Sequence, residues 1–187
     1  MRILEHTFED YLNIVKLFHG YMAPGVIIGG FMVDTAVRKL ANDILYNAIC
    51  ETQSCLPDAI QILTPCTIGN GWLKIISSGR YALALYDKSN GEGVRVFLDA
   101  EKVEPWKEIR AWYLKLKSKS EQDSEEILRE IKEAGNSILN IQHVHIKPQI
   151  AEKKHKGKIG LCPKCREAYP SDIGDICPAC QGETPYL

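Results

Sequence analysis

The sequence predicts an α+β body followed by a small four-cysteine zinc module. Two helical patterns precede a set of short strand patterns separated by turn signals, and further helical patterns follow, as is typical of an antiparallel sheet with packed helices. The end of the chain holds two Cys-x-x-Cys pairs among few large apolar residues. We therefore expect an α+β core domain over residues 1–147, a basic linker over 148–160 and a zinc module over 161–187.

The first helix has a well-defined start and stop. Thr7 and Asp10 have the spacing of a capping box, and apolar residues recur at helical intervals from Phe8 onward. His19 falls in the last turn, and Gly20 is a natural stop. The pattern predicts a helix over residues 8–19.

The second helix is apolar on most of its faces. Pro24 suits its first turn, and we expect it to run to about Ala41. Gly29 and Gly30 would weaken an exposed helix, so we expect close packing against a neighbour. The apolar run is too short to span a bilayer, and the N-terminus lacks an apolar signal core, so we expect no membrane association and a place in the cytoplasm.

The remaining body alternates strand and helix patterns. Turns at Ser78-Gly79 and Asn90-Gly91 separate three strands of a predicted meander. A later helix is expected to open at Ser120 or Ser124 and to end near Gly135. In chain order, the sequence predicts a strand at 45–51, a short helix at 57–63, a loop at 64–71, strands at 72–76, 81–86 and 94–98, a charged helix at about 104–117, the later helix, and a last strand at 138–146.

Composition narrows the function classes. A net charge of −1 gives no overall attraction to nucleic acid or to a membrane surface. A content of 45% hydrophobic and 25% charged residues is typical of a folded globular chain. In the reducing cytoplasm disulfides are rare, so the 7 cysteines call for another explanation: metal ligands, reactive thiols or small core residues.

The four C-terminal cysteines have the pattern of a structural metal site. Two residues separate the cysteines of each pair, and two such turns can close a tetrahedron of thiolates around Zn²⁺. So short a segment cannot build an apolar core alone and would obtain its folding free energy from the metal. Iron in a rubredoxin-like site is the alternative metal. The predicted zinc ligands of this zinc ribbon or treble clef are Cys162, Cys165, Cys177 and Cys180.

Two stretches of the body carry residues suited to binding or catalysis. In the first, His19 ends one helix and faces the start of the next, where an anion is favoured. In the second, Cys55 precedes a short helix whose N-terminus would lower the thiol pKa, and Cys66 lies in a Gly-rich loop beyond it. We expect His19, Cys55 and Cys66 to converge on one cleft, with Gly20, Gly25 and Gly69 leaving room for a small molecule.

These two stretches resemble the motifs of the FmdE family, a family of proteins associated with formylmethanofuran dehydrogenase. The resemblance covers roughly residues 8–100 and implies an α+β core, and the C-terminal module is similar to a treble-clef finger carried by some members. The matching residues are Phe18, His19, Gly20, Pro24, Gly25 and Gly29 in the first motif, and Glu51, Thr52, Cys55, Asp58, Ala59, Ile60, Gln61, Cys66, Thr67 and Gly69 in the second.

The chain departs from the family motif at three positions. Tyr21 stands where the family has a second histidine, and Ala23 stands where it has a cysteine. Pro65 replaces the glycine before Cys66 and stiffens that loop. If the family's cleft holds a metal, the resemblance leaves His19, Cys55 and Cys66 as its ligands here, with Tyr21 as an added cleft residue and a weakened or altered site.

The resemblance implies a metal-binding accessory protein of a molybdenum- or tungsten-dependent dehydrogenase of C1 metabolism. No molybdopterin site or iron–sulfur array is recognisable, so we assign no dehydrogenase reaction to this chain, and whether it is an enzyme stays open. The alternative is a small enzyme that uses His19 as base or metal ligand and Cys55 or Cys66 as nucleophile or ligand. A nucleic-acid-binding regulator using the zinc module and the linker lysines is the weakest alternative.

Other residues receive a structural interpretation. Cys50 lies in an apolar strand and is expected in the core. His143 and His145 alternate along a strand, so both rings should point to one face, although two ligands do not make a metal site. The apolar face of the helix around Trp106 and the apolar second helix predict a homodimer with twofold symmetry.

Overall fold

The computed structural model describes residues 1–41, 43–151 and 157–186, and it divides the chain into two compact units. The first unit, Met1–Ala151, is called the body here, and the second, Glu152–Leu187, the module. The elements of the body are β1 Arg2–Ile3, β2 His6–Thr7, α1 Phe8–His19, α2 Pro24–Lys39, β3 Tyr46–Cys50, α3 Leu56–Leu63, β4 Leu73–Ile75, β5 Ala82–Asp87, β6 Glu92–Leu98, α4 Lys107–Tyr113, η1 Lys119–Glu121, α5 Ser124–Ala134, η2 Gly135–Ile138, β7 Leu139–His145 and α6 Pro148–Ala151.

The predicted caps of α1 are present. The Thr7 hydroxyl accepts the Asp10 backbone N–H at 3.1 Å, and the Asp10 carboxylate accepts the Thr7 backbone N–H in return. Gly20 ends the helix with φ 90°, a left-handed conformation that glycine adopts without strain. The capping residues therefore fix both ends of α1, and His19 is held at its last turn.

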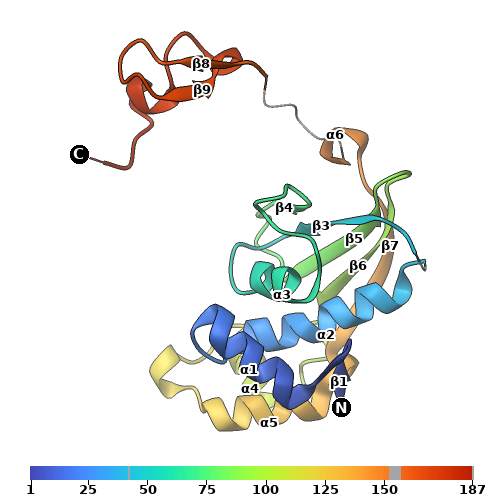
Figure 1. Cartoon of the computed structure of the whole chain (residues 1–187). Coiled ribbons are helices and arrows are strands. Elements are labelled where there is room, and N and C mark those ends of the chain that lie inside the picture. Colours follow the sequence, from blue (N-terminus) through green and yellow to red (C-terminus); the bar gives the residue numbers. More distant parts are fainter. Residues whose placement is uncertain (42, 152–156, 187) are drawn as a thin grey trace. The chain divides into compact units, whose positions relative to one another are not determined.

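Helix α2 lies at the centre of the body, between the sheet on one side and α1 and α5 on the other (Figure 1). Every residue from Gly25 to Ala36 is buried. The expected close packing at the glycines is present, since a Cβ at Gly29 would lie 2.6 Å from the Ala59 Cβ of α3. The small residues of α2 thus allow α3 to approach closely and hold its first turn near the start of α2.

The body contains a five-stranded sheet with the order β4-β3-β5-β6-β7. All neighbouring strands are antiparallel except β3 and β4, which pair in parallel, with Ala48 opposite Leu73. The meander prediction is therefore wrong for the strand at 72–76, which does not pair with the next strand along the chain. The reason is the crossover through α3, which returns the chain to the outer edge of β3 in the same direction.

The two helices after the sheet support each other. Helix α4 is shorter than the helix expected over 104–117, and no side chain of its own N-cap residue bonds its first turn. Instead, the buried Glu130 of α5 accepts the backbone N–H groups of Glu108 and Ile109, each at 2.9 Å. A carboxylate from a neighbouring helix therefore supplies the cap that the local sequence lacks.

The module is built on a short antiparallel hairpin. Its elements are β8 Ile159–Leu161, β9 Ala168–Pro170, η3 Ser171–Ile173 and η4 Pro178–Gln181. Part of the predicted linker is ordered, since α6 and β8 fall within 148–160, while residues 152–156 lie outside the described part of the chain. No helix among the described residues is long and apolar enough to cross a membrane.

Candidate metal centre and core cluster

The four cysteines of the module come together. Cys162 follows β8 directly, Cys165 lies on the turn between β8 and β9, and Cys177 is the N-cap of η4, which contains Cys180. Their sulfur atoms all lie within 4.8 Å of one another. Among the described residues this is the one group of three or more His, Cys, Asp or Glu side chains close enough to share a metal ion.

The four thiols fit a tetrahedral metal ion. Zinc–sulfur bonds of about 2.3 Å place the sulfurs of a tetrahedron roughly 3.8 Å apart, and Cys165 Sγ lies 3.7 Å from Cys177 Sγ. The Cys177 backbone N–H points at Cys162 Sγ at 3.5 Å, as expected around a metal-bound thiolate. Backbone N–H groups of Cys165 and Cys177 lower the pKa of the Cys162 thiol to about 6, whereas burial raises that of Cys180 to about 12. The donor set is thus suited to a thiophilic divalent ion.

In the body, His19 forms a close pair with a carboxylate that was not predicted as a site residue. The His19 Nδ1 atom lies 2.6 Å from Asp58 Oδ2, and both side chains are partly buried. Asp58 stands in the first turn of α3, and its backbone N–H bonds the Cys55 carbonyl at 3.1 Å. The last turn of α1 and the first turn of α3 therefore bring His19, Asp58 and Cys55 into one place, named here the core cluster.

Cys55 has an unusual backbone and a tightly packed side chain. It is a non-glycine residue with φ 56° at the N-cap of α3, a conformation that costs about 1–3 kcal/mol. A Cβ at Gly25 would lie 2.8 Å from the Cys55 Cβ and 2.7 Å from the Tyr81 hydroxyl. The space beside Gly25 is therefore filled by these neighbours, and the prediction that it leaves room for a ligand is wrong.

The pKa expected for Cys55 is also wrong. Burial raises the pKa of this thiol, the Asp58 carboxylate raises it further, and the Lys119 ammonium lowers it. The start of α3 was expected to favour the thiolate, but the same first turn carries the Asp58 carboxylate, whose charge opposes it. Cys55 is thus held mainly as a neutral thiol.

Tyr21 and Lys119 complete one side of the core cluster. The ring centroids of Tyr21 and His19 lie 4.9 Å apart, and the Lys119 Nζ lies 4.9 Å from the centroid of the Tyr21 ring. Tyr81 belongs to the opposite, buried side: its hydroxyl donates to the Gly25 carbonyl at 2.6 Å, and burial raises its pKa well above the usual value. The cluster thus has a buried wall and an exposed, cationic edge.

Cys66 lies elsewhere. It follows the C-terminal end of α3, whereas Cys55 precedes its N-terminal end, and the eight residues of this helix span roughly 12 Å. The Cys66 side chain is fully buried, and its thiol points to the Tyr46 carbonyl of β3 at 3.6 Å. The structure therefore does not bring Cys66 to His19. Cys50 is also fully buried, in the core as expected.

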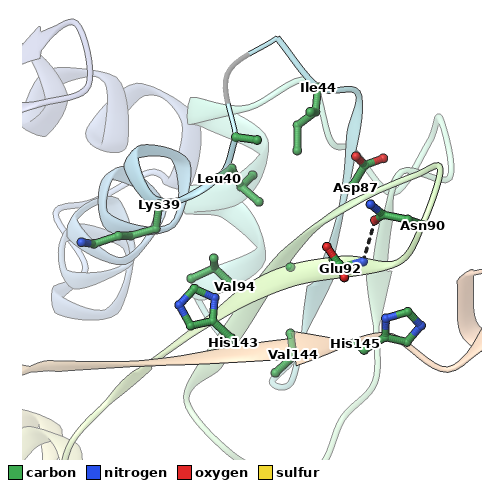
Figure 2. A pocket seen from close by; sticks show the side chains of 12 residues that line it. Lys39, Leu40, Ile44, Asp87, Asn90, Glu92, Val94, His143, Val144 and His145 are labelled. Atoms are coloured by element: carbon green, nitrogen blue, oxygen red, sulfur yellow. Dashed lines mark hydrogen bonds between the residues drawn. The ribbon is translucent and has the colours of Figure 1, made fainter.

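His143 and His145 line a pocket of about 530 Å³ between the end of α2 and strands β6 and β7 (Figure 2). Lys39, Asp87 and Glu92 are the charged residues of its wall. The two rings lie on one face of β7, as predicted, and they form no three-ligand group with other described residues. This pocket carries no metal site.

Comparison with known proteins places the body in a family. The family model described as "FmdE, Molybdenum formylmethanofuran dehydrogenase operon" matches residues 18–146, well over half of the 187-residue chain. The chain belongs to the FmdE family. A second model, described as "FmdE treble clef zinc finger", matches residues 153–187. Of the two module folds that the cysteine spacing allows, the treble clef is the one supported.

Two similar proteins extend this result. A tungsten formylmethanofuran dehydrogenase FmdE-like protein from Syntrophus aciditrophicus is 59% identical, with a TM-score of 0.93 over 100% of this chain and 98% of the other. A probable S-adenosyl-L-methionine-binding protein from Archaeoglobus fulgidus is 31% identical over 89% of this chain. The FmdE-family chain spans about half the length of that relative, 51%.

Sequence reasoning found the four metal-binding thiols and missed three residues of the core cluster. Asp58 stands inside the second motif, where a carboxylate in the first turn of a helix was available as a signal. Tyr81 and Lys119 lie far along the chain and reach the cluster only through tertiary packing. No local pattern marks these two.

Proposed function

We propose that this chain is a zinc-containing accessory protein of a molybdenum- or tungsten-dependent formylmethanofuran dehydrogenase. The observation that carries the proposal is the FmdE body joined to a four-thiol treble clef, together with the 59% identical neighbour described as an FmdE-like protein of the tungsten enzyme. The partner enzyme would carry out the one-carbon chemistry, and this chain would bind to it, assemble it or regulate it.

In this proposal the four thiols hold one Zn²⁺ ion that stabilises the module. A closed set of four protein ligands leaves no open coordination position, so the metal has a structural role. The residues of this chain supply the rest: the hairpin β8–β9 presents the first pair of thiols, and the start of η4 presents the second. The zinc is therefore expected to determine whether the module is folded.

The accessory role predicts direct association with the dehydrogenase. The purified full chain should co-sediment with a purified tungsten formylmethanofuran dehydrogenase complex at micromolar concentration. Cys177→Ser, which opens the module, tests whether the finger contributes to binding. Failure of the full, zinc-loaded chain to co-sediment would contradict the accessory role and leave the family assignment intact.

A second candidate is a ligand-binding or catalytic role for the core cluster. It is favoured by the strained backbone of Cys55 beside the His19–Asp58 pair, because strained residues concentrate at functional sites. S-adenosyl-L-methionine is the ligand named for the Archaeoglobus relative, so calorimetric titration with it is a direct test. The absence of binding would leave that ligand to the half of the relative that this chain does not match.

A further inference from the structure

We infer that Lys119 and Tyr21 make the core cluster a site for a small carboxylate-bearing ligand, which Lys119 draws to the Cys55 thiol. This inference deepens the second candidate function, because it names a ligand class for that cluster. It rests on how the cationic edge is placed and held, and on the charges that face the thiol.

The position of Lys119 is fixed by its own segment. The Ser118 hydroxyl donates to Glu121 Oε2 at 2.6 Å, and the Ser118 backbone N–H donates to the same oxygen at 2.9 Å. These bonds close a capping box around η1, which contains Lys119. The lysine is exposed, yet its backbone is tied down beside the cluster.

Tertiary contacts bring this segment to the core cluster. Trp112 of α4 meets the Tyr81 ring edge-to-face at a centroid distance of 5.8 Å, and Tyr81 in turn contacts the wall formed by Gly25 and Cys55. The Lys119 ammonium then lies over the Tyr21 ring, which packs on His19. An unbroken series of contacts therefore links the cation to the imidazole and the thiol.

The charge of Lys119 is available to a ligand. Within the described part of the chain, no carboxylate lies within ion-pair distance of its ammonium group, whereas most basic side chains of the sheet and of α5 are paired. The Asp58 carboxylate, which also faces Cys55, is bound to His19. A ring face holds a cation in place without neutralising it, so an incoming anion still experiences its full charge.

Tyr21 is the residue that makes this arrangement possible. At the position where the family motif has a histidine, this chain presents an aromatic face with a hydroxyl and no strong base. Ala23, at the motif's cysteine position, is buried and offers no ligand atom. The two departures thus favour an organic anion over a metal ion at this edge.

Alkylation of Cys55 in the full chain tests the inference. Iodoacetate carries a carboxylate and iodoacetamide is its neutral counterpart. In both reactions the thiolate sulfur forms a bond to the methylene carbon, iodide leaves with the electron pair of the carbon–iodine bond, and the thiol proton passes to the buffer. Peptide mass spectrometry assigns the rate to Cys55, and the iodoacetate-to-iodoacetamide rate ratio reports the potential at this thiol.

We expect Lys119→Gln to lower that ratio by roughly three- to fivefold at low salt, with the difference largely gone at 1 M salt, because a single exposed charge acts over several Å and is then screened. Tyr21→Ala should have the same effect, because Lys119 loses the ring that positions it, whereas Tyr21→Phe should keep the ratio. Lys107→Gln, which removes an exposed lysine of α4, is the matched control and should leave the ratio unchanged.

Millimolar acetate should also slow iodoacetamide alkylation of the wild type and leave Lys119→Gln unaffected. Protection by phosphate in place of acetate would overturn the carboxylate class. A ratio that does not depend on Lys119 would overturn the inference while keeping Cys55 accessible. A Cys55 inert to both reagents in the native chain would instead contradict the core cluster as a binding site.

Discussion

At the scale of single residues, Gly25 determines how the core cluster is assembled. Tyr81 and Cys55 meet at the space that a side chain would occupy there. A substitution with even one additional carbon must displace the buried phenol or the thiol, because packed interiors relax only partly. Gly25 thus links the start of α2 to the strained N-cap of α3.

Gly25→Ala should therefore destabilise the body. The overlap costs about 1–3 kcal/mol, which exceeds the gain of up to about 1 kcal/mol that alanine brings to a helix. Urea unfolding followed by far-ultraviolet circular dichroism measures the change. Gly69→Ala is the matched control: its nearest neighbour would be the Thr67 Oγ1 at 4.0 Å, so a change within about 0.5 kcal/mol is expected.

A second residue-scale prediction concerns the metal ligands. Cys177→Ser removes a thiolate and the N-cap of η4, so the bound zinc should be lost and residues 157–186 should become sensitive to protease. The body should keep its melting temperature. Inductively coupled plasma mass spectrometry with limited trypsin digestion measures both effects. Retention of the full zinc content by the variant would be evidence against Cys177 as a ligand.

At the scale of elements, an ion-pair network ties β3, β5 and β6 together on one face of the sheet. Glu51, directly after β3, receives two bonds from Arg95 of β6, at 2.6 and 2.9 Å, and one from Arg80 at 2.7 Å. The Arg95 guanidinium is the largest cause that holds the pKa of Glu51 below its usual range, against the opposing effect of burial. A bidentate pair of this kind fixes the relative position of the strands.

The lowered pKa of Glu51 predicts an acid-dependent loss of stability. A carboxyl group with a lower pKa in the folded state stabilises the fold above its unfolded pKa of about 4.3, and this contribution is lost as pH falls through the folded value. Below about pH 5, the free energy of unfolding should therefore fall more steeply for wild type than for Glu51→Gln. Parallel slopes in urea titrations at several pH values would show that Glu51 makes no such contribution.

Local signals predicted the elements better than their arrangement. The caps of α1, the proline start of α2 and the turn residues place most helices and strands within a few residues of their observed bounds. The pairing of β3 with β4 depends on the crossover through α3, and the cap of α4 comes from Glu130 on another helix. Neither relation is encoded in neighbouring residues.

The same distinction explains the sites. The four thiols form a complete local motif, so their spacing alone predicted the cluster. The core cluster takes His19 from α1, Asp58 from α3, Tyr81 from the sheet and Lys119 from η1. Periodicity and motif spacing give no account of such long-range contacts, and they wrongly grouped Cys66 with His19.

At the scale of the whole molecule, the homodimer remains a prediction, with a changed basis. Helix α2 is covered within one chain, so its apolar character no longer calls for a partner. Exposed apolar side chains remain at the end of α1 and after α4, including Leu17, Leu114 and Leu116. Such residues favour association when they form a patch.

Sedimentation velocity at low micromolar concentration tests this prediction. A species with twice the chain mass of 21.0 kDa is expected, and Leu116→Glu should shift it toward the monomer. The control Leu161→Glu alters an exposed residue of the module and leaves the body unchanged. A wild-type chain that sediments as a single 21.0 kDa species would argue against the dimer.

The central claim is that an FmdE body without a metal of its own carries a separate zinc module. The most direct measurement is the metal content per chain of the full protein and of a chain ending at Ile150, which removes all four thiols of the metal centre. We predict one zinc ion per full chain and none in the shortened chain, with the body still folded by circular dichroism. Zinc or another metal retained in stoichiometric amount by the shortened chain, or a full chain without metal, would contradict the account.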